Sequence, residues 1–354
     1  MFVAWRDLKA AKGRFALITA VVTLITVLVT FLGGLTGGLV EQNISALTSL
    51  DADRIVFSVT DGEPSTYADS AVTEDQASTW ARRDGVTAVE PLGISTTRIT
   101  AGGRQQTVAL FGGGPAAGDA ATRSGHVALT ARTAAALDVQ PGDRVHLGDR
   151  DLVVDATRGD SWYSHLAVAH VSLGDWQHLA ARPGEPAPFA SVLAVSARDA
   201  DYAAADAAAG TSSQGLLTSL TALGSFTSEV GSLLLMVLML FGISALVVGA
   251  FFAVWSIQRR PDVAVLKALG ATDRMLTFDA LGQAAALLVL GVGAGIAVTA
   301  GLGALAGTAL PFVLSSVTTL LPGLVMTVLG LAGAGVATRS ITHVDPLTAL
   351  GSNR

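Results

Sequence analysis

Four long apolar runs constrain this chain more than any other feature, because helices of such length and composition are stable across a bilayer. The first run covers residues 17–40, and about 24 helical residues span roughly 36 Å against roughly 30 Å of hydrocarbon. Three further runs lie within residues 216–257 and 277–338. With 51% hydrophobic and 14% charged residues, the composition is too apolar for an ordinary soluble domain.

The charges divide the chain into an acidic and a basic part. Residues 41–229 contain 12 Arg, no Lys and 23 acidic residues, a net charge of −11. The remainder has 10 basic against 5 acidic residues, a net of +5. Because basic residues collect on the cytoplasmic side of membrane proteins, we expect the acidic part to lie outside the plasma membrane and both termini inside.

The predicted fold is a membrane α-helical protein with four transmembrane helices and an α+β extracellular domain inserted between the first and second spans. We expect a glycine face at residues 33–38 to pack closely against another helix, and two copies of the chain to form a homodimer through this face and the second span. The predicted segments are an amphipathic helix (1–16), the first span (17–40), the extracellular domain (41–215), a stalk with the second span (216–257), a cytoplasmic helix (258–276), the third and fourth spans (277–338) and a cytoplasmic tail (339–354).

Several kinds of chemistry are excluded by the residues that are missing. The chain has no cysteine, so disulfides and thiolate sites are absent. It has no G-x-x-x-x-G-K-[ST] motif, and Gly112-Gly113-Gly114 is not followed by a lysine. No nucleophile elbow, permanent cofactor or nucleic-acid partner is expected. The chain is predicted not to be an enzyme.

The stretch Gln258 to Leu276, QRRPDVAVLKALGATDRML, lies between two spans and carries a helical pattern. Its pattern Arg-Arg-x-Asp-Val-Ala-Val-Leu-Lys-Ala-Leu-Gly-Ala resembles the coupling helix of MacB/FtsX-type permeases of ABC transporters. The tail, Arg339 followed by Asp345-Pro346-Leu347-Thr348-Ala349-Leu350, is similar to that family's C-terminal signature. The resemblance implies a lipid-embedded permease served by two copies of a separate cytoplasmic ATPase subunit. The residues predicted to couple to that ATPase are Arg259, Arg260, Val263, Leu266, Lys267, Leu269 and Gly270.

The N-terminal sequence MFVAWRDLKAAKGRF and the overall length of the chain resemble those of haem-efflux permeases of Gram-positive bacteria. This resemblance implies haem as the transported ligand, moved outward by mechanotransmission. A haem path needs an iron ligand and an apolar slot, and a carboxylate at a span end is a functional candidate. Glu229 is the first predicted iron ligand and Glu41 the second. Met236 is a further candidate, because a methionine thioether can ligate haem iron. The remaining predicted haem-binding residues, Phe226, Leu233 and Phe31, are expected to line the apolar slot.

Other readings stay open at this point. His165 and His170 bracket a predicted strand and are interpreted as structural or surface residues. An FtsX-like subunit that signals to an extracellular partner without cargo is the alternative function. Export of a lipopeptide, antibiotic or lipoprotein is a further one.

Overall fold

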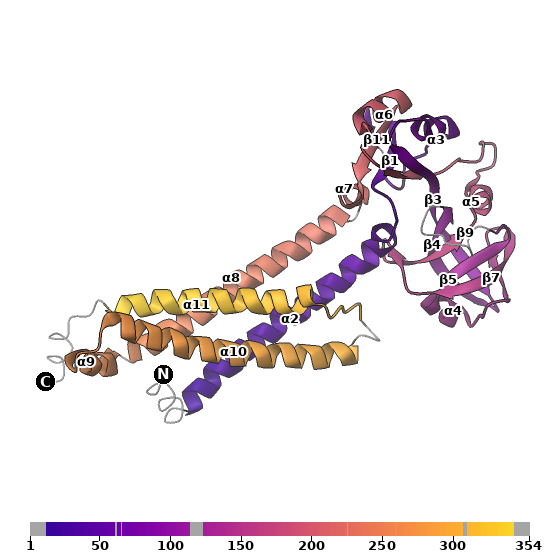
Figure 1. The fold of residues 1–354 in the computed structure, drawn as a ribbon. Helices are drawn as coiled ribbons and strands as arrows, with labels where there is room; N and C mark the ends of the chain where they lie inside the picture. Colours follow the sequence, from indigo (N-terminus) through magenta and orange to yellow (C-terminus); the bar gives the residue numbers. More distant parts are fainter. Residues whose placement is uncertain are drawn as a thin grey trace. The chain divides into compact units, whose positions relative to one another are not determined.

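The computed structural model describes residues 12–60, 62–64, 66–113, 123–224, 226–258, 260–306 and 310–342. The chain forms two compact units, which we call the membrane unit (Met1–Gly38 and Ser232–Arg354) and the inserted unit (Leu39–Gly231). Within the described residues, four helices are long and apolar enough to cross a membrane (Figure 1). They are α2 (Lys12–Thr48), α8 (Phe226–Gln258), α10 (Asp273–Ala306) and α11 (Leu321–Thr342). The fold is therefore four membrane helices with an α+β domain inserted between the first and second.

Small residues let the helices of the membrane unit approach closely, as is usual where lipid offers no hydrophobic driving force. Gly295 of α10 faces α2, where a Cβ atom would come within 2.6 Å of the Cβ of Thr26. Thr30 and Thr299 link the same two helices through hydroxyl groups 2.7 Å apart. Both threonines are fully buried, so this polar contact is shielded from lipid.

Helix α8 touches the rest of the membrane unit along one narrow side. A Cβ atom on Gly333 of α11 would lie only 3.0 Å from the Cα atom of Gly249 of α8, so the two backbones are nearly in contact. The opposite side of α8 is uncovered, with Leu235, Leu238 and Leu246 more than half exposed. This apolar side is available to lipid or to another protein.

The glycine face of α2 packs closely, but its partner is not a second copy of the chain. A Cβ atom on Gly38 would overlap the carbonyl oxygen of Pro311, and one on Gly34 would overlap the ring of Phe312. The Phe312 ring also lies 5.0 Å from that of Phe31. The segment before η4 (Ser316–Leu320) therefore folds back onto α2, and the expectation that two copies meet through this face is wrong.

The inserted unit is built around one sheet of eleven strands. The strands are β1 (Arg54–Thr60), β2 (Glu63–Pro64), β3 (Val86–Ala101), β4 (Arg104–Gly113), β5 (His126–Thr130), β6 (Arg144–Leu147), β7 (Arg150–Arg158), β8 (Trp162–Tyr163), β9 (Leu166–Val171), β10 (Val192–Ala197) and β11 (Thr211–Gly215). The helices are α3 (Glu74–Ala81), α4 (Ala131–Leu137), α5 (Leu173–Ala180), α6 (Tyr202–Ala209), α7 (Leu216–Ser219) and the 3-10 turn η3 (Leu220–Ala222).

Strand β3 belongs to two parts of this sheet. Its first half lies in the order β11-β1-β10-β3, and its second half continues through β4, β9, β5 and β7 to β6. Because β6 pairs back with β3 at Ile99 and Thr100, these six strands close into a small barrel. The pairs β4–β9 and β5–β7 are parallel, whereas the other strand pairs are antiparallel.

The period-two alternation of strand side chains divides the core of the inserted unit. On β1, Ile55 and Phe57 face a cluster that includes Leu47 of α2 and Leu220 of η3. Val56 points the other way, to the cluster beneath α3 and α6 that contains Trp80. A third cluster fills the barrel, and its large members include Leu110, Leu129 and Trp176.

Several predicted boundaries shift. The predicted stalk and second span (216–257) do not form one helix, because α7 and η3 are followed by a break before α8 begins at Phe226. Leu220 and Leu223 are buried in the inserted unit, which explains why the chain bends there instead of continuing straight. The cytoplasmic helix is shorter than predicted, since α9 covers Arg260–Ala268. Residues 1–11, Arg259 and the tail motif at 345–350 lie outside the described residues.

Candidate functional site

Two side chains of the inserted unit converge on one carboxylate oxygen, Oε2 of Glu229. Glu229 lies in the first turn of α8, and its side chain is 28% exposed. Asn43 of α2 donates from Nδ2 over 2.9 Å, and Nε2 of His165 also lies 2.9 Å away. The first-ranked iron ligand of the sequence prediction is thus held by an amide and an imidazole.

His165 is presented by a strained two-residue turn between β8 and β9. Ser164 and His165 have φ angles of 47° and 63°, a left-handed conformation that glycine or asparagine normally supplies. The turn is fastened to the end of α2, because the amides of Ser164 and His165 donate to the carbonyls of Asn43 (3.0 Å) and Gln42 (2.9 Å). These contacts fix the imidazole beside Glu229.

The other predicted haem-binding residues do not join this cluster. Glu41 is exposed on α2, two residues before Asn43. Phe226 is half-buried and packs against the core of the inserted unit. In the membrane unit, Phe31 is half-buried beside Phe312. Leu233, half-buried on α8, belongs to the same unit.

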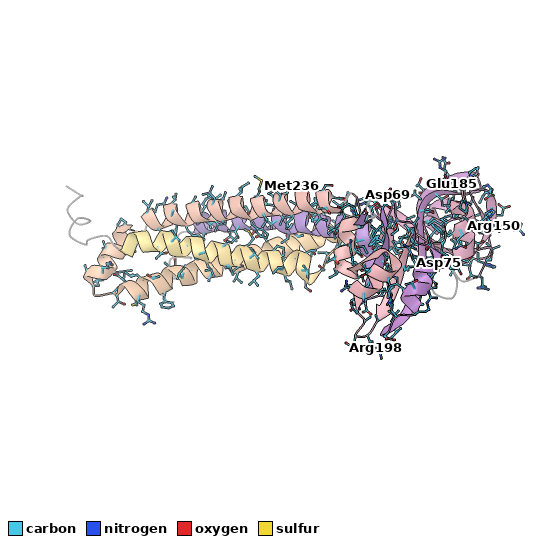
Figure 2. All side chains as sticks on the ribbon, turned by 90° about the horizontal axis from the view of Figure 1, so that it is seen from above. Asp69, Asp75, Arg150, Glu185, Arg198 and Met236 are labelled. Carbon is cyan, nitrogen blue, oxygen red and sulfur yellow. The ribbon has the colours of Figure 1, made fainter. Side chains whose placement is uncertain are left out.

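Met236 is the deepest of the predicted haem-binding residues along α8. Its side chain is 50% exposed and lies on the outer side of the helix (Figure 2). It does not belong to the buried core cluster of the membrane unit. It is thus placed as an accessible apolar group.

Helix α9 ends in a Schellman motif, which gives the predicted coupling segment a defined stop. The amide of Ala271 donates to the Leu266 carbonyl over 2.9 Å, and that of Gly270 to the Lys267 carbonyl over 2.9 Å. Gly270 has φ 95°, which a residue with a Cβ atom rarely adopts. Gly270 is therefore required by the backbone of this turn.

The exposure of side chains along α9 and its terminal turn does not follow their polarity. Lys267 is only 15% exposed and pairs with Asp273 of α10. Leu269 is 79% exposed and Val265 is 53% exposed, four residues apart on one side. Val263 and Leu266 are half-buried, and nothing is described of the Arg260 side chain beyond its helical backbone. The accessible apolar pair is therefore Val265 and Leu269.

The inserted unit also has a cleft, and none of the predicted site residues lines it. It is an open cleft of about 1110 Å³, lined in part by Tyr67, Tyr163, Trp176 and strand residues of β3. Burial raises the pKa of both tyrosine hydroxyl groups well above their ordinary value. On β9, burial and the nearby Arg158 charge lower the pKa of His170 to about 4, so this imidazole is neutral at physiological pH.

The sequence prediction missed Asn43 and His165 as contacts of Glu229. No spacing in the sequence brings residues 43, 165 and 229 together, because each lies on a different element. The only local signal is the short Tyr163-Ser164-His165-Leu166 turn, which carries neither glycine nor asparagine. The sheet topology alone places this turn against the end of α2.

Comparison with known proteins supports the assignment of the membrane helices. Residues 233–346 match the family model described as FtsX-like permease C-terminal. A protein of Staphylococcus haemolyticus named as a hemin transport system permease protein, HrtB, is 35% identical over 129 residues, covering 36% of this chain and 37% of that protein. The protein of the same name in Staphylococcus epidermidis (strain ATCC 12228) is 26% identical over 132 residues, with coverages of 37% and 38%. The matches therefore span less than two-fifths of these relatives.

Two solved structures resemble the chain at low sequence identity. The periplasmic region of MacB from Actinobacillus actinomycetemcomitans aligns with a TM-score of 0.36 and 13% identity, covering 51% of this chain and 94% of that one. The extracellular domain of the ABC-type transporter YknZ from Gram-positive bacteria aligns with a TM-score of 0.31 and 13% identity, covering 45% and 89%.

Proposed function

We propose that this chain, whose residues 233–346 form an FtsX-like permease domain, is the membrane subunit of an ATP-driven exporter in the plasma membrane. The observation that carries the proposal is α9 with its terminal turn, which lies between two membrane helices and exposes Val265 of the helix and Leu269 of the turn. An exposed apolar pair on a helix is suited to a groove on another protein. The chain itself has no nucleotide-binding motif, so ATP hydrolysis belongs to a separate ATPase partner.

The basic residues of the membrane unit orient the proposed exporter. By the positive-inside rule, α9 and both termini face the cytoplasm and the acidic inserted unit faces outward. The ATPase would push on α9, and the tie between Lys267 and Asp273 would carry that motion into α10. A homodimer with two ATPase subunits is the expected assembly, and the uncovered side of α8 is a better candidate for its interface than the filled glycine face.

Haem is the cargo that we propose. Two relatives are named as hemin transport permeases, and Glu229 supplies a partly exposed carboxylate that is suited to bind ferric iron. The carboxylate is already held by Asn43 and His165, so iron would have to displace or join those contacts. Leu233 and Met236 remain candidates for apolar contact with a porphyrin.

The ATPase partnership is tested by a pair of leucine variants. We expect the affinity-purified chain in lipid nanodiscs to retain an ATP-hydrolysing subunit, and Leu269→Asp to lose it without loss of folded chain. Leu217→Asp is the matched control, since Leu217 is 73% exposed but lies on α7 of the inserted unit. Wild-type chain that never retains an ATPase would overturn the proposal.

The cargo is tested separately with haemin. We expect haemin to raise the ATPase rate of the complex, to give a shifted Soret band, and to lose both effects in Glu229→Gln. Cells that lack the chain should become sensitive to haemin. An ATPase rate and a spectrum that haemin leaves unchanged would remove haem as the cargo while leaving the permease assignment in place.

The cleft of the inserted unit favours a second candidate function, control of an extracellular protein. Its size and its lining of aromatic and hydroxyl groups are suited to a segment of another chain. Substitution of Thr96 by Glu, on the exposed part of β3 that lines the cleft, would block such a partner but leave haemin-stimulated ATPase activity unchanged.

A further inference from the structure

The cluster of Asn43, His165 and Glu229 has the composition of a metal site. It combines one imidazole nitrogen, one carboxylate and one amide, supplied by three separate elements of the inserted unit. Among the described residues no three His, Asp or Glu side chains meet, so the amide would have to act as the third ligand. Amide oxygens do bind metal ions, as carboxylates and imidazoles do.

Asn43 has an unused oxygen at this place. The residue is 1% exposed, and its Oδ1 finds no hydrogen-bond partner within the described part of the chain. The nitrogen and oxygen of such an amide exchange positions by a half-turn of the group. After that half-turn the oxygen of Asn43 would lie where Nδ2 now lies, 2.9 Å from Oε2 of Glu229. Two oxygens at that distance repel each other unless a cation or a proton lies between them.

The distances in the cluster are close to those between ligands of a single ion. Zinc binds nitrogen and oxygen at about 2.0–2.2 Å in a tetrahedral arrangement, so two neighbouring ligands are about 3.4 Å apart. Nε2 of His165 and Oε2 of Glu229 are 2.9 Å apart. The pair therefore needs little movement to bind an ion in place of its hydrogen bond.

The strained turn adds a reason for His165 to be at this position. Left-handed conformations of residues other than glycine persist where the surrounding structure holds them, and they cluster at functional sites. Two hydrogen bonds to α2 carbonyls hold Ser164 and His165, and the amide of Trp162 donates to Oγ of Ser45 over 2.9 Å. This anchoring fixes the imidazole before any ligand arrives.

We propose that His165 Nε2, the Glu229 carboxylate and the Asn43 amide oxygen bind a divalent transition-metal ion such as Zn²⁺, Co²⁺ or Ni²⁺. An imidazole ligand favours these ions over Mg²⁺ and Ca²⁺, which prefer oxygen. With only three protein ligands, the remaining coordination positions are open to water or to another ligand. The site does not depend on haem as cargo, because it takes a free ion.

Cobalt titration tests the site directly. The full-length, tag-free chain in nanodiscs, without haemin, is titrated with Co²⁺ and followed by its visible absorption. We expect one Co²⁺ per chain, displaced by Zn²⁺ and not by Mg²⁺, and a higher melting temperature with bound ion. His165→Ala and Glu229→Gln should each weaken binding at least tenfold. The control is His146→Ala, because His146 pairs with Asp151 on the exposed surface in the same unit.

Asn43→Asp separates a metal site from a hydrogen-bonded pair. If Asn43 is a ligand, a carboxylate in its place should tighten Co²⁺ binding about tenfold or more. If the amide only donates to Glu229, two carboxylates close together should lower the melting temperature without tighter binding, and the proposal fails. It also fails if wild-type chain shows no saturable Co²⁺ binding. Haemin binding is measured in a separate titration, so loss of one activity does not decide the other.

Discussion

The ammonium group of Lys267 lies 2.6 Å from the carboxylate of Asp273, which ties the end of α9 to the first turn of α10. The turn at Gly270 lies between them, so the ion pair closes a short loop around the Schellman motif. Asp273 is 60% exposed, and exposed pairs contribute about 1 kcal/mol or less. The pair therefore matters more for the angle between the two helices than for overall stability.

We expect Asp273→Asn to leave the fold and the melting temperature almost unchanged but to loosen this junction. Amide hydrogen exchange at residues 266–273 should become faster, and cargo-stimulated ATPase activity should fall several-fold. The charge-swapped variant Lys267→Asp with Asp273→Lys is the control, and it should recover part of both. Exchange rates that are identical in Asp273→Asn and wild type would show that the ion pair does not hold the junction.

Two glycines of α10 make a matched pair for the packing of the membrane unit. Gly295→Ala places a methyl group against Thr26, and overpacking of this kind costs about 1–3 kcal/mol. Gly293→Ala meets nothing within 4 Å and should gain up to about 1 kcal/mol of helix propensity. Melting of each variant in nanodiscs checks this, and equal melting temperatures would contradict the described α2–α10 contact.

His170 should make the inserted unit sensitive to acid. Burial lowers its pKa from 6.5 to about 4. Above pH 6.5 the imidazole is neutral in both states and has no effect. Between pH 6.5 and 4 the unfolded chain binds a proton that the folded chain excludes, so the free energy of unfolding falls, by about 3 kcal/mol below pH 4.

Tryptophan fluorescence during thermal unfolding at pH 8, 6 and 4 measures this contribution. His170→Phe should flatten the pH dependence, since phenylalanine still packs against Phe111 but does not titrate. His146→Gln, at an exposed surface position, should leave the pH dependence as in wild type. The assignment to His170 is refuted if the phenylalanine variant keeps the full acid sensitivity.

The carboxylate of Asp175 should be among the most sensitive positions of the barrel. It is fully buried and accepts from the Gly125 amide (2.8 Å) and the Ser172 hydroxyl (2.8 Å), in addition to pairing with Arg150. Because Arg150 is 37% exposed, we expect a loss of less than the roughly 3–5 kcal/mol that breaking a fully buried pair costs. We expect Asp175→Asn to lower the melting temperature by many degrees.

The matched control is Asp149→Asn, because Asp149 is 73% exposed and pairs only with His178 at the surface among the described contacts. This substitution should leave melting unchanged. The stability of both variants is measured by chemical denaturation. It is followed by tryptophan fluorescence, to which Trp176 in the barrel core contributes. A small effect of Asp175→Asn would indicate that the Arg150 pair adds little.

The membrane helices could be predicted from sequence because length and apolarity alone decide them. Strand pairs joined by short turns can also be predicted from sequence. The turn at Gly102 and Gly103 between β3 and β4 is an example, because both glycines have positive φ angles. Closure of the barrel by β6 on β3 could not be predicted, since it depends on pairing between distant residues. The burial of Trp255 beside Phe15 was likewise not accessible, because it depends on packing between helices far apart in the sequence.

The candidate site shows the same limit more sharply. Glu229 was identified because a carboxylate next to an apolar run is unusual. Its partners Asn43 and His165 lie 186 and 64 residues away, so only tertiary structure joins them. Lys267 was predicted to couple to the ATPase. In the structure its ammonium group pairs with Asp273, six residues further along the chain, and its side chain is only 15% exposed.

The approach of Gly249 to Gly333 leaves no side chain between two backbones. Without side chains at this contact, neither helix has a ridge that fits into a groove of the other. A shift of α8 along α11 would therefore meet little steric resistance at this point. On its other side, the bare leucine flank of α8 holds it to no neighbour within the described residues.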